Sequence, residues 1–331
     1  MELLKNYDIE IKESVKYLDS EEAFKSIEAN AYWPKWNSPW WHMTLLNEMG
    51  LAGKIPERII QKMTSKLKAS PLTVFPIRPG ELPKEVDLSL DTHCHCALGN
   101  IYQALAAWGL DIDLELPWIR KWFLKYQLPD GGFNCDNNAY LKNPPPSSMV
   151  GTILPLEAIL FFTPREFTKE EIRFLDLGAQ CLIKRQLMYA TSNPHNAEEN
   201  EDEEDWLKLC FPRFYLYDVL RGLNFLLKWS DRRNQRLNYT AISKVVEYLE
   251  RSFSDGLMRI GRHSFENVKS LIQSPSGEWI KRQPASHFPL LNKVSGIRDV
   301  SPFLSDQWRE AKVLMRNLIQ RGLLPSMTQR P

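Results

Sequence analysis

Residues 92–133 read THCHCALGNIYQALAAWGLDIDLELPWIRKWFLKYQLPDGGF and contain a pair of helices that sets the pattern for the whole chain. The first half, residues 92–110, is apolar on nearly every face, whereas residues 116–128 place charged side chains on one face of a helix. A helix that is apolar all round is buried, and a helix with a charged face covers it. The pair therefore predicts an inner and an outer layer of helices.

The same alternation recurs along the chain, and strand patterns are scarce. Apolar segments begin at Ser38, Thr92, Ser148 and Phe211. Each is followed by an amphipathic segment, beginning at Pro56, Leu116, Lys169 and Ala241. Repeated helix pairs of this kind stack on their neighbours. We expect an all-α fold, an α/α toroid of about five or six hairpins, with residues 1–331 in one domain and further helices at 7–18 and 304–322.

Two stretches depart from this pattern. Residues 196–206 include the run AEENEDEEDW, and a block of like charges is usually a solvated segment, so we expect an acidic surface loop. Residues 260–300 contain the turn-forming run Ser274-Pro275-Ser276-Gly277 and no sustained period, which predicts a long irregular connection.

Composition excludes several classes of protein. The 42 Lys and Arg residues balance 41 Asp and Glu residues, so the chain lacks the basic excess of a nucleic-acid-binding protein. We expect no transmembrane segment, because no apolar run approaches the roughly 18 residues that a membrane-spanning helix needs. The N-terminus lacks the pattern of a secretory signal. The unevenly spaced cysteines, Cys94, Cys96, Cys135, Cys181 and Cys210, favour free thiols in a reducing compartment, and we expect a cytoplasmic protein.

The amphipathic helix of the quoted pair ends in a distinctive pattern. Phe123-Leu124 is followed by Gln127 and by Gly131-Gly132-Phe133. Here the sequence resembles the terpenoid cyclase and protein prenyltransferase superfamily of α/α toroids, whose outer helices end in a similar pattern. The glycine pair lets the chain turn tightly beside the next helix, and the Gln side chain can satisfy backbone groups left open at the helix end. The motif is therefore structural.

The resemblance implies a central cavity that binds an apolar, isoprenoid-like small molecule, with transferase or cyclase chemistry. The chain lacks both the Asp-x-Asp-Asp motif of protonating cyclases and the Asp-x-Cys zinc pair of prenyltransferases, so neither activity follows directly. Two other classes stay open. One is a non-catalytic binding or interaction scaffold with an unknown protein partner. The other is a carbohydrate-active enzyme, for which Asp130, Asp136 and Asp218 are the candidate carboxylates.

Aromatic side chains gather at the starts of the first and fourth apolar segments. Aromatic walls can enclose an isoprenoid chain, and the same residues are also normal core components. The candidates for substrate binding are Trp40, Trp41, His42, Phe133, Phe214, Tyr215 and Tyr217. Asp218, among these aromatics, is a candidate proton donor with Asp136 as a second acid. The alternative for Asp218 is an ion pair with Arg221, three residues later on a helix.

The densest group of reactive side chains is Asp91, His93, Cys94, His95 and Cys96. On a helix His93 and Cys96 share a face, so both could reach one zinc ion. Cys135, just beyond the Gly-Gly turn, could be a third ligand. The alternative is that these side chains only fill the core around an inner helix, because free cysteine is among the most buried residue types.

Overall fold

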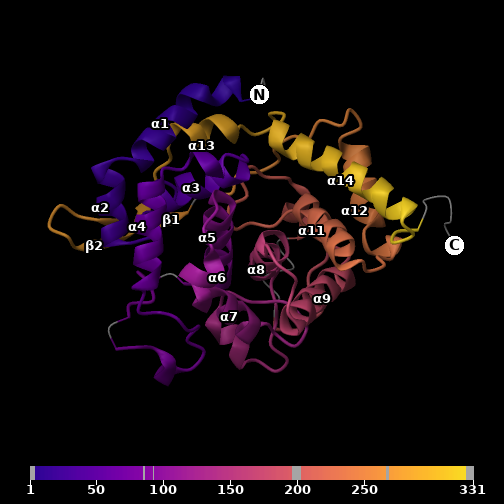
Figure 1. The fold of residues 1–331 in the computed structure, drawn as a ribbon, viewed down its shortest axis with the longest axis horizontal. Coiled ribbons are helices and arrows are strands. Elements are labelled where there is room, and N and C mark those ends of the chain that lie inside the picture. Colours follow the sequence, from indigo (N-terminus) through magenta and orange to yellow (C-terminus); the bar gives the residue numbers. More distant parts are fainter. Residues whose placement is uncertain (1–3, 85, 92, 196–202, 266–267, 326–331) are drawn as a thin grey trace.

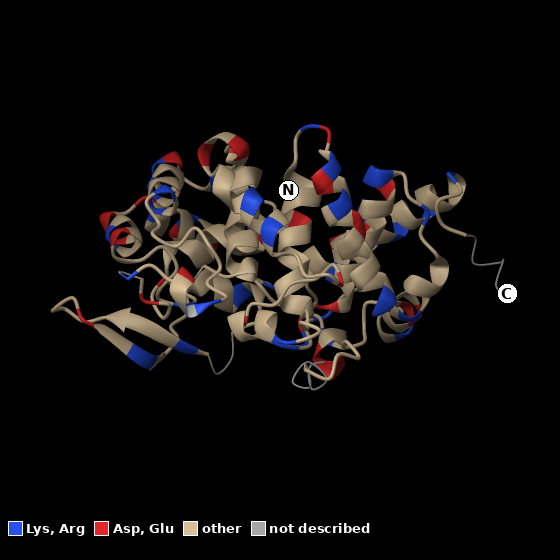
Figure 2. Cartoon of the chain, turned by 90° about the horizontal axis from the view of Figure 1, so that it is seen from below, with Lys and Arg blue, Asp and Glu red and all other residues tan. Residues whose placement is uncertain are grey.

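The computed structural model describes residues 4–84, 86–91, 93–195, 203–265 and 268–325, and these are mostly helical (Figure 1). One two-stranded sheet accompanies the helices. Within the described ranges, no helix combines the length and the apolar character needed to cross a membrane. Along the ribbon in Figure 2, lysine and arginine are interspersed with aspartate and glutamate.

Five helices pack in series across the molecule, each against the next, and the last of them buries only one face. Near the centre of Figure 1, α5 and α11 lie on either side of α8. Their apolar sequences explain the burial: every residue of α5 from His95 to Leu105 is buried. In packing order the series is α3 (Pro39–Glu48), α5 (His95–Trp108), α8 (Met149–Phe162), α11 (Val219–Arg233) and α14 (Pro302–Gln320).

Amphipathic helices cover this series. The outer helices α7, α9 and α12 pack on α5, α8 and α11, as the alternation in the sequence predicts. Their bounds are α7 (Pro117–Tyr126), α9 (Lys169–Lys184) and α12 (Ser243–Ser252). Three further helices, α1 (Asp8–Leu18), α2 (Glu21–Ala29) and α4 (Glu57–Lys68), lie on the α3 side of the molecule. Short helices are α6 (Ile112–Glu115), α10 (Glu203–Leu207) and α13 (Pro289–Val294), with 3-10 turns at Lys5–Tyr7, Ala52–Lys54, Pro79–Glu81, Asn137–Leu141 and Tyr239–Ala241.

The turn after α7 has the structural role that the motif predicts. Gly131 has φ +93°, and a Cβ atom there would lie 2.1 Å from the carbonyl oxygen of Leu177 on α9. Only glycine permits both that backbone conformation and that approach. The Gln127 side chain donates to the carbonyl oxygens of Gly131 (2.8 Å) and Phe174 (2.9 Å). The turn thereby fastens the end of α7 to α9.

The stretch 260–300, expected to be irregular, contains regular structure. Strands β1 (Lys269–Gln273) and β2 (Trp279–Pro284) form an antiparallel hairpin that projects from the body (Figure 2), and α13 follows it. The turn-forming run at 274–277 closes this hairpin, with the Gly277 amide bonded to the Ser274 carbonyl. Most strand residues are exposed, so the sequence carries no alternating apolar pattern. The acidic loop was expected at residues 196–206. Residues 196–202 lie outside the described ranges, and Glu203–Leu207 form the short helix α10.

Candidate metal centre

Three cysteine thiols meet beside the start of α5. Cys94 caps the N-terminus of this helix, Cys96 lies in its first turn, and Cys135 comes from the segment after α7. The Sγ atoms of Cys94 and Cys96 are 3.2 Å apart, and all three sulfur atoms lie within 4.8 Å of one another. Among the described residues these thiols form a group with metal-ligand geometry.

The fold brings Cys135 to this point through the turn that follows α7. Phe133 forms a β-bridge with Ser148, whose amide donates to the Phe133 carbonyl at 2.7 Å. The Asn134 side chain donates to the carbonyl oxygen of Pro146 at 3.0 Å. The segment is therefore tied to the start of α8, and Cys135 is held against the N-terminus of α5. That helix terminus favours a negatively charged ligand set.

The three thiols share hydrogen bonds, and these set their acidity. Hydrogen bonds from the thiols of Cys135 and then Cys96 hold the pKa of Cys94 well below its usual range. Hydrogen bonds with Cys135 and Cys94, together with burial, raise the pKa of Cys96. The hydrogen bond with Cys94 and burial likewise raise the pKa of Cys135. Cys94 is therefore the most acidic of the three thiols. A bound cation would favour the loss of the thiol protons.

A half-buried lysine, Lys35, lies among several aromatic rings. The Lys35 ammonium donates to the Tyr215 hydroxyl at 3.1 Å and lies 5.0 Å from the centre of that ring. Its distances to the Tyr32 and Trp36 rings are 5.8 and 5.4 Å. Burial lowers the pKa of Lys35, while the charges of Cys96 and Cys94 raise it. In the described part of the chain no carboxylate forms an ion pair with Lys35.

His93 does not belong to this centre, although the sequence suggested it as a ligand with Cys96 and Cys135. Helix α5 begins only at His95, so the helical spacing that would join His93 to Cys96 is absent. The His93 Nε2 atom instead lies 3.1 Å from Ser70 Oγ, and burial lowers the pKa of the ring to about 4. Cys94 is the third thiol of the cluster in place of His93. The sequence feature that could have indicated Cys94 is the Cys-x-Cys pair at the start of a helix.

His95, from the same group in the sequence, and His42, a candidate for substrate binding, have structural contacts. His95 Nδ1 accepts a hydrogen bond from Trp122 Nε1 (2.8 Å), and its Nε2 atom lies 2.9 Å from the Tyr140 hydroxyl. Both ring nitrogens are therefore occupied. His42 stacks on Phe288, with ring centres 3.6 Å apart, and its Nδ1 atom lies 2.7 Å from Ser14 Oγ. Burial lowers the pKa of both histidines to about 3.

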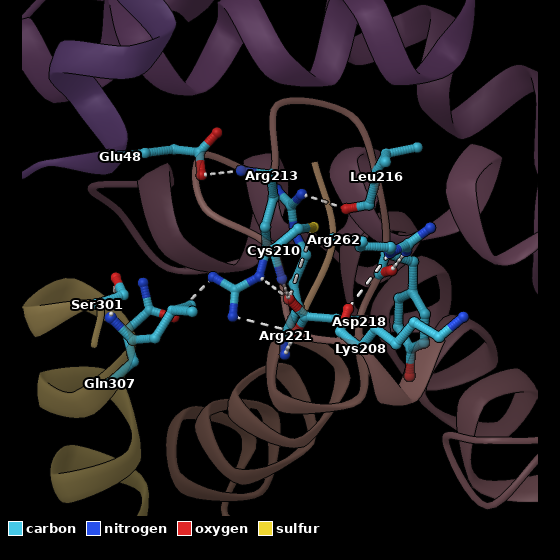
Figure 3. Close-up of polar contacts among 12 residues, drawn as sticks. Glu48, Lys208, Cys210, Arg213, Leu216, Asp218, Arg221, Arg262, Ser301 and Gln307 are labelled. Atoms are coloured by element: carbon cyan, nitrogen blue, oxygen red, sulfur yellow. Dashed lines mark hydrogen bonds and ion pairs between the residues drawn. The ribbon is translucent and has the colours of Figure 1, made fainter. Parts of the chain in front are cut away.

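The candidate acids have separate places. Asp218 caps α11 and accepts hydrogen bonds from Arg213 at 2.6 and 3.1 Å (Figure 3). The expected partner, Arg221, donates only its backbone amide to Asp218, and its guanidinium pairs with Glu157 on α8 at 2.6 Å. Asp136 is exposed and caps the 3-10 turn at Asn137–Leu141. Asp130 bonds Ser147 and its own Gly-Gly turn.

The candidate aromatic residues pack mainly in the core. The Trp41 ring contacts those of Trp36 and Phe214, with centres 4.3 and 5.1 Å apart. Tyr217 donates to the Leu187 carbonyl at 2.7 Å. Little or no surface is exposed on Trp40, Trp41, Phe133, Phe214 and Tyr217. Tyr215, by contrast, is half-buried beside Lys35. The packing alternative thus accounts for most of this set, and the apolar ligand stays a prediction.

With the centre defined by Cys94, Cys96 and Cys135, comparison gives no relative: no family model, no curated protein and no solved structure matches the chain.

Proposed function

We propose that the protein binds zinc, or a divalent ion of similar preference for sulfur, through the thiolates of Cys94, Cys96 and Cys135. The proximity of these three sulfur atoms carries the proposal. A tetrahedral zinc ion lies about 2.3 Å from each thiolate, which corresponds to sulfur atoms roughly 3.8 Å apart. The separations here, from 3.2 Å to at most 4.8 Å, bracket that value.

Charge balance supports the same proposal. Three thiolates around a divalent cation carry one excess negative charge, and a buried excess charge is costly unless it is compensated. Lys35 supplies a compensating positive charge, held against the Tyr215 hydroxyl and the aromatic faces around it.

Three protein ligands point to a site with an exchangeable fourth position. Structural zinc sites are usually closed by four protein ligands, whereas catalytic sites keep one position for water or substrate. Neither His93 nor His95 is placed to close this one. Bound there, zinc would supply Lewis acidity and activate a coordinated water or thiol. Intact thiols require reducing conditions, which favours the cytoplasm.

The toroid and its isoprenoid-like ligand belong to the same proposal. Two features support a resemblance to the terpenoid cyclase and prenyltransferase superfamily. One is the packing order of the helices α3, α5, α8, α11 and α14, and the other is the set of contacts made by Gln127 and Gly131. A metal centre with an exchangeable position supports a transferase role over that of a scaffold.

Zinc titration of the reduced, metal-free protein tests the proposed function. We expect one zinc ion per chain, with a dissociation constant of about 1 nM or below in competition with a chromophoric chelator. Bound zinc should also protect three of the five thiols from alkylation. Micromolar or weaker zinc binding, with the same alkylation of the thiols in the presence and absence of zinc, would contradict the proposal. The three cysteines would then only fill the core.

A further inference from the structure

A second feature, with no residue of the metal centre in its wall, is a polar cavity between the buried helices. Its volume is about 260 Å³, and α3, α5, α8, α11 and α14 all contribute to its lining. That size is just below the roughly 300–1,000 Å³ of pockets for drug-sized ligands. A molecule of monosaccharide size would fit.

The wall of this cavity is built from buried charged groups in fixed positions. Arg213 pairs with Asp218 and donates to Gln307 Oε1 at 2.7 Å. Arg221 donates to both carboxylate oxygens of Glu157, at 2.6 to 3.0 Å. Networks of this kind are costly to bury, and apolar replacements are often neutral or stabilising. Charged groups fixed in this way can hold a ligand in one orientation.

Other polar groups on the wall have unused hydrogen-bonding capacity. In the described part of the chain, the side chains of Asn47, Asn224 and Glu310 make no hydrogen bond or ion pair, although all three line the cavity. Lys228 also lines it and lies over the Phe161 ring at 4.8 Å, without a carboxylate partner there. The cavity therefore presents amide, carboxylate and ammonium groups that a ligand could engage.

The charges narrow the class of ligand. Three basic residues of the lining, Arg213, Arg221 and Lys228, balance three acidic ones, Glu48, Glu157 and Glu310. A lining with balanced charges gives no net attraction to phosphates and diphosphates or to simple amines. A neutral ligand fits better. Amide groups both donate and accept hydrogen bonds, as vicinal hydroxyl groups do, and Phe161 and Phe162 offer apolar faces.

We propose that this cavity binds a small neutral polyol of the monosaccharide class. The Asn47 and Asn224 amides, from α3 and α11, bond its hydroxyl groups, and the Phe161 ring packs against its C–H face. The site lies apart from the three thiols, so the polyol binds in the presence or absence of zinc.

Ligand binding to the full chain tests this assignment. The probes are D-glucose, D-galactose, D-mannose, D-ribose and myo-inositol, with pyrophosphate and butylamine as charged comparisons, measured by saturation-transfer NMR and calorimetry. We expect at least one polyol to bind with and without zinc, and neither charged probe to displace it. Failure of every polyol, or displacement by pyrophosphate or butylamine, would overturn the proposal.

Two substitutions on different helices locate the site. Asn224→Ala and Asn47→Ala should each weaken binding about three- to tenfold, the effect of one lost hydrogen bond. Asn292→Ala, at an exposed position on α13, is the matched control and should bind as the unsubstituted protein does. Because the two substitutions lie on different helices, the binding site can still be tested with one variant if the other fails to fold. Unchanged affinity in both would place the ligand elsewhere.

Discussion

Replacing Cys135 by serine is expected to weaken zinc binding by at least about 100-fold. A serine hydroxyl stays protonated at neutral pH and is a poor zinc ligand, so only two thiolates, Cys94 and Cys96, would remain. Cys135 is the most informative of the three because it comes from a different segment than the Cys-x-Cys pair. Competition with a chromophoric chelator at fixed pH and reductant measures the change.

Cys181→Ser is the matched control for this prediction. Cys181 is also buried, but it lies on α9 near Ser147 and outside the thiol cluster. Its replacement should leave zinc affinity within about twofold of the unsubstituted protein, a change of roughly 0.4 kcal/mol. Equal affinities in Cys135→Ser and Cys181→Ser would show that zinc, if it binds, binds elsewhere.

Replacing Arg221 by methionine should lower the free energy of unfolding by about 3–5 kcal/mol. The substitution keeps an apolar stem but leaves Glu157, which is 5% exposed, without its guanidinium partner. It also removes the donors to the backbone carbonyls of Phe214 and Leu216. Urea denaturation monitored by tryptophan fluorescence would measure the loss.

Two further variants separate the buried charge from general damage. Glu157→Met combined with Arg221→Met should regain part of the lost stability, because no unpaired charge remains. Arg309→Met breaks an exposed pair with Asp306 and should cost less than about 1 kcal/mol. A loss below about 1 kcal/mol in Arg221→Met itself would contradict a buried pair.

The helices followed from local signals in the sequence. Apolar and amphipathic segments alternate, and recognisable cap residues precede them. Ser148 is the N-cap of α8, and Thr168 is the N-cap of α9, where it forms a capping box with Glu171. The role of the Gln127 and Gly131 pattern was also predictable, because it concerns backbone groups next to it in the chain. Periodicity and capping are properties of short stretches, which is why they could be read directly.

The residues of the candidate site could not all be predicted from short stretches of sequence. His93 was placed with Cys96 by helical spacing, but the helix starts two residues later, and the N-cap residue Cys94 joins the cluster instead. Helix starts are uncertain by one or two residues, and that shift changes which side chains meet. The partner of Arg221 is Glu157, on another helix and far away in sequence. Such long-range pairings follow from packing and not from spacing.

X-ray absorption spectroscopy of the zinc-loaded protein tests the metal centre most directly. We predict three sulfur neighbours at about 2.3 Å and one nitrogen or oxygen neighbour at about 2.0–2.1 Å, the pattern of three thiolates with one exchangeable ligand. Cys94, Cys96 and Cys135 would supply the sulfur atoms. A zinc environment of nitrogen and oxygen alone, without sulfur neighbours, would contradict the proposed centre.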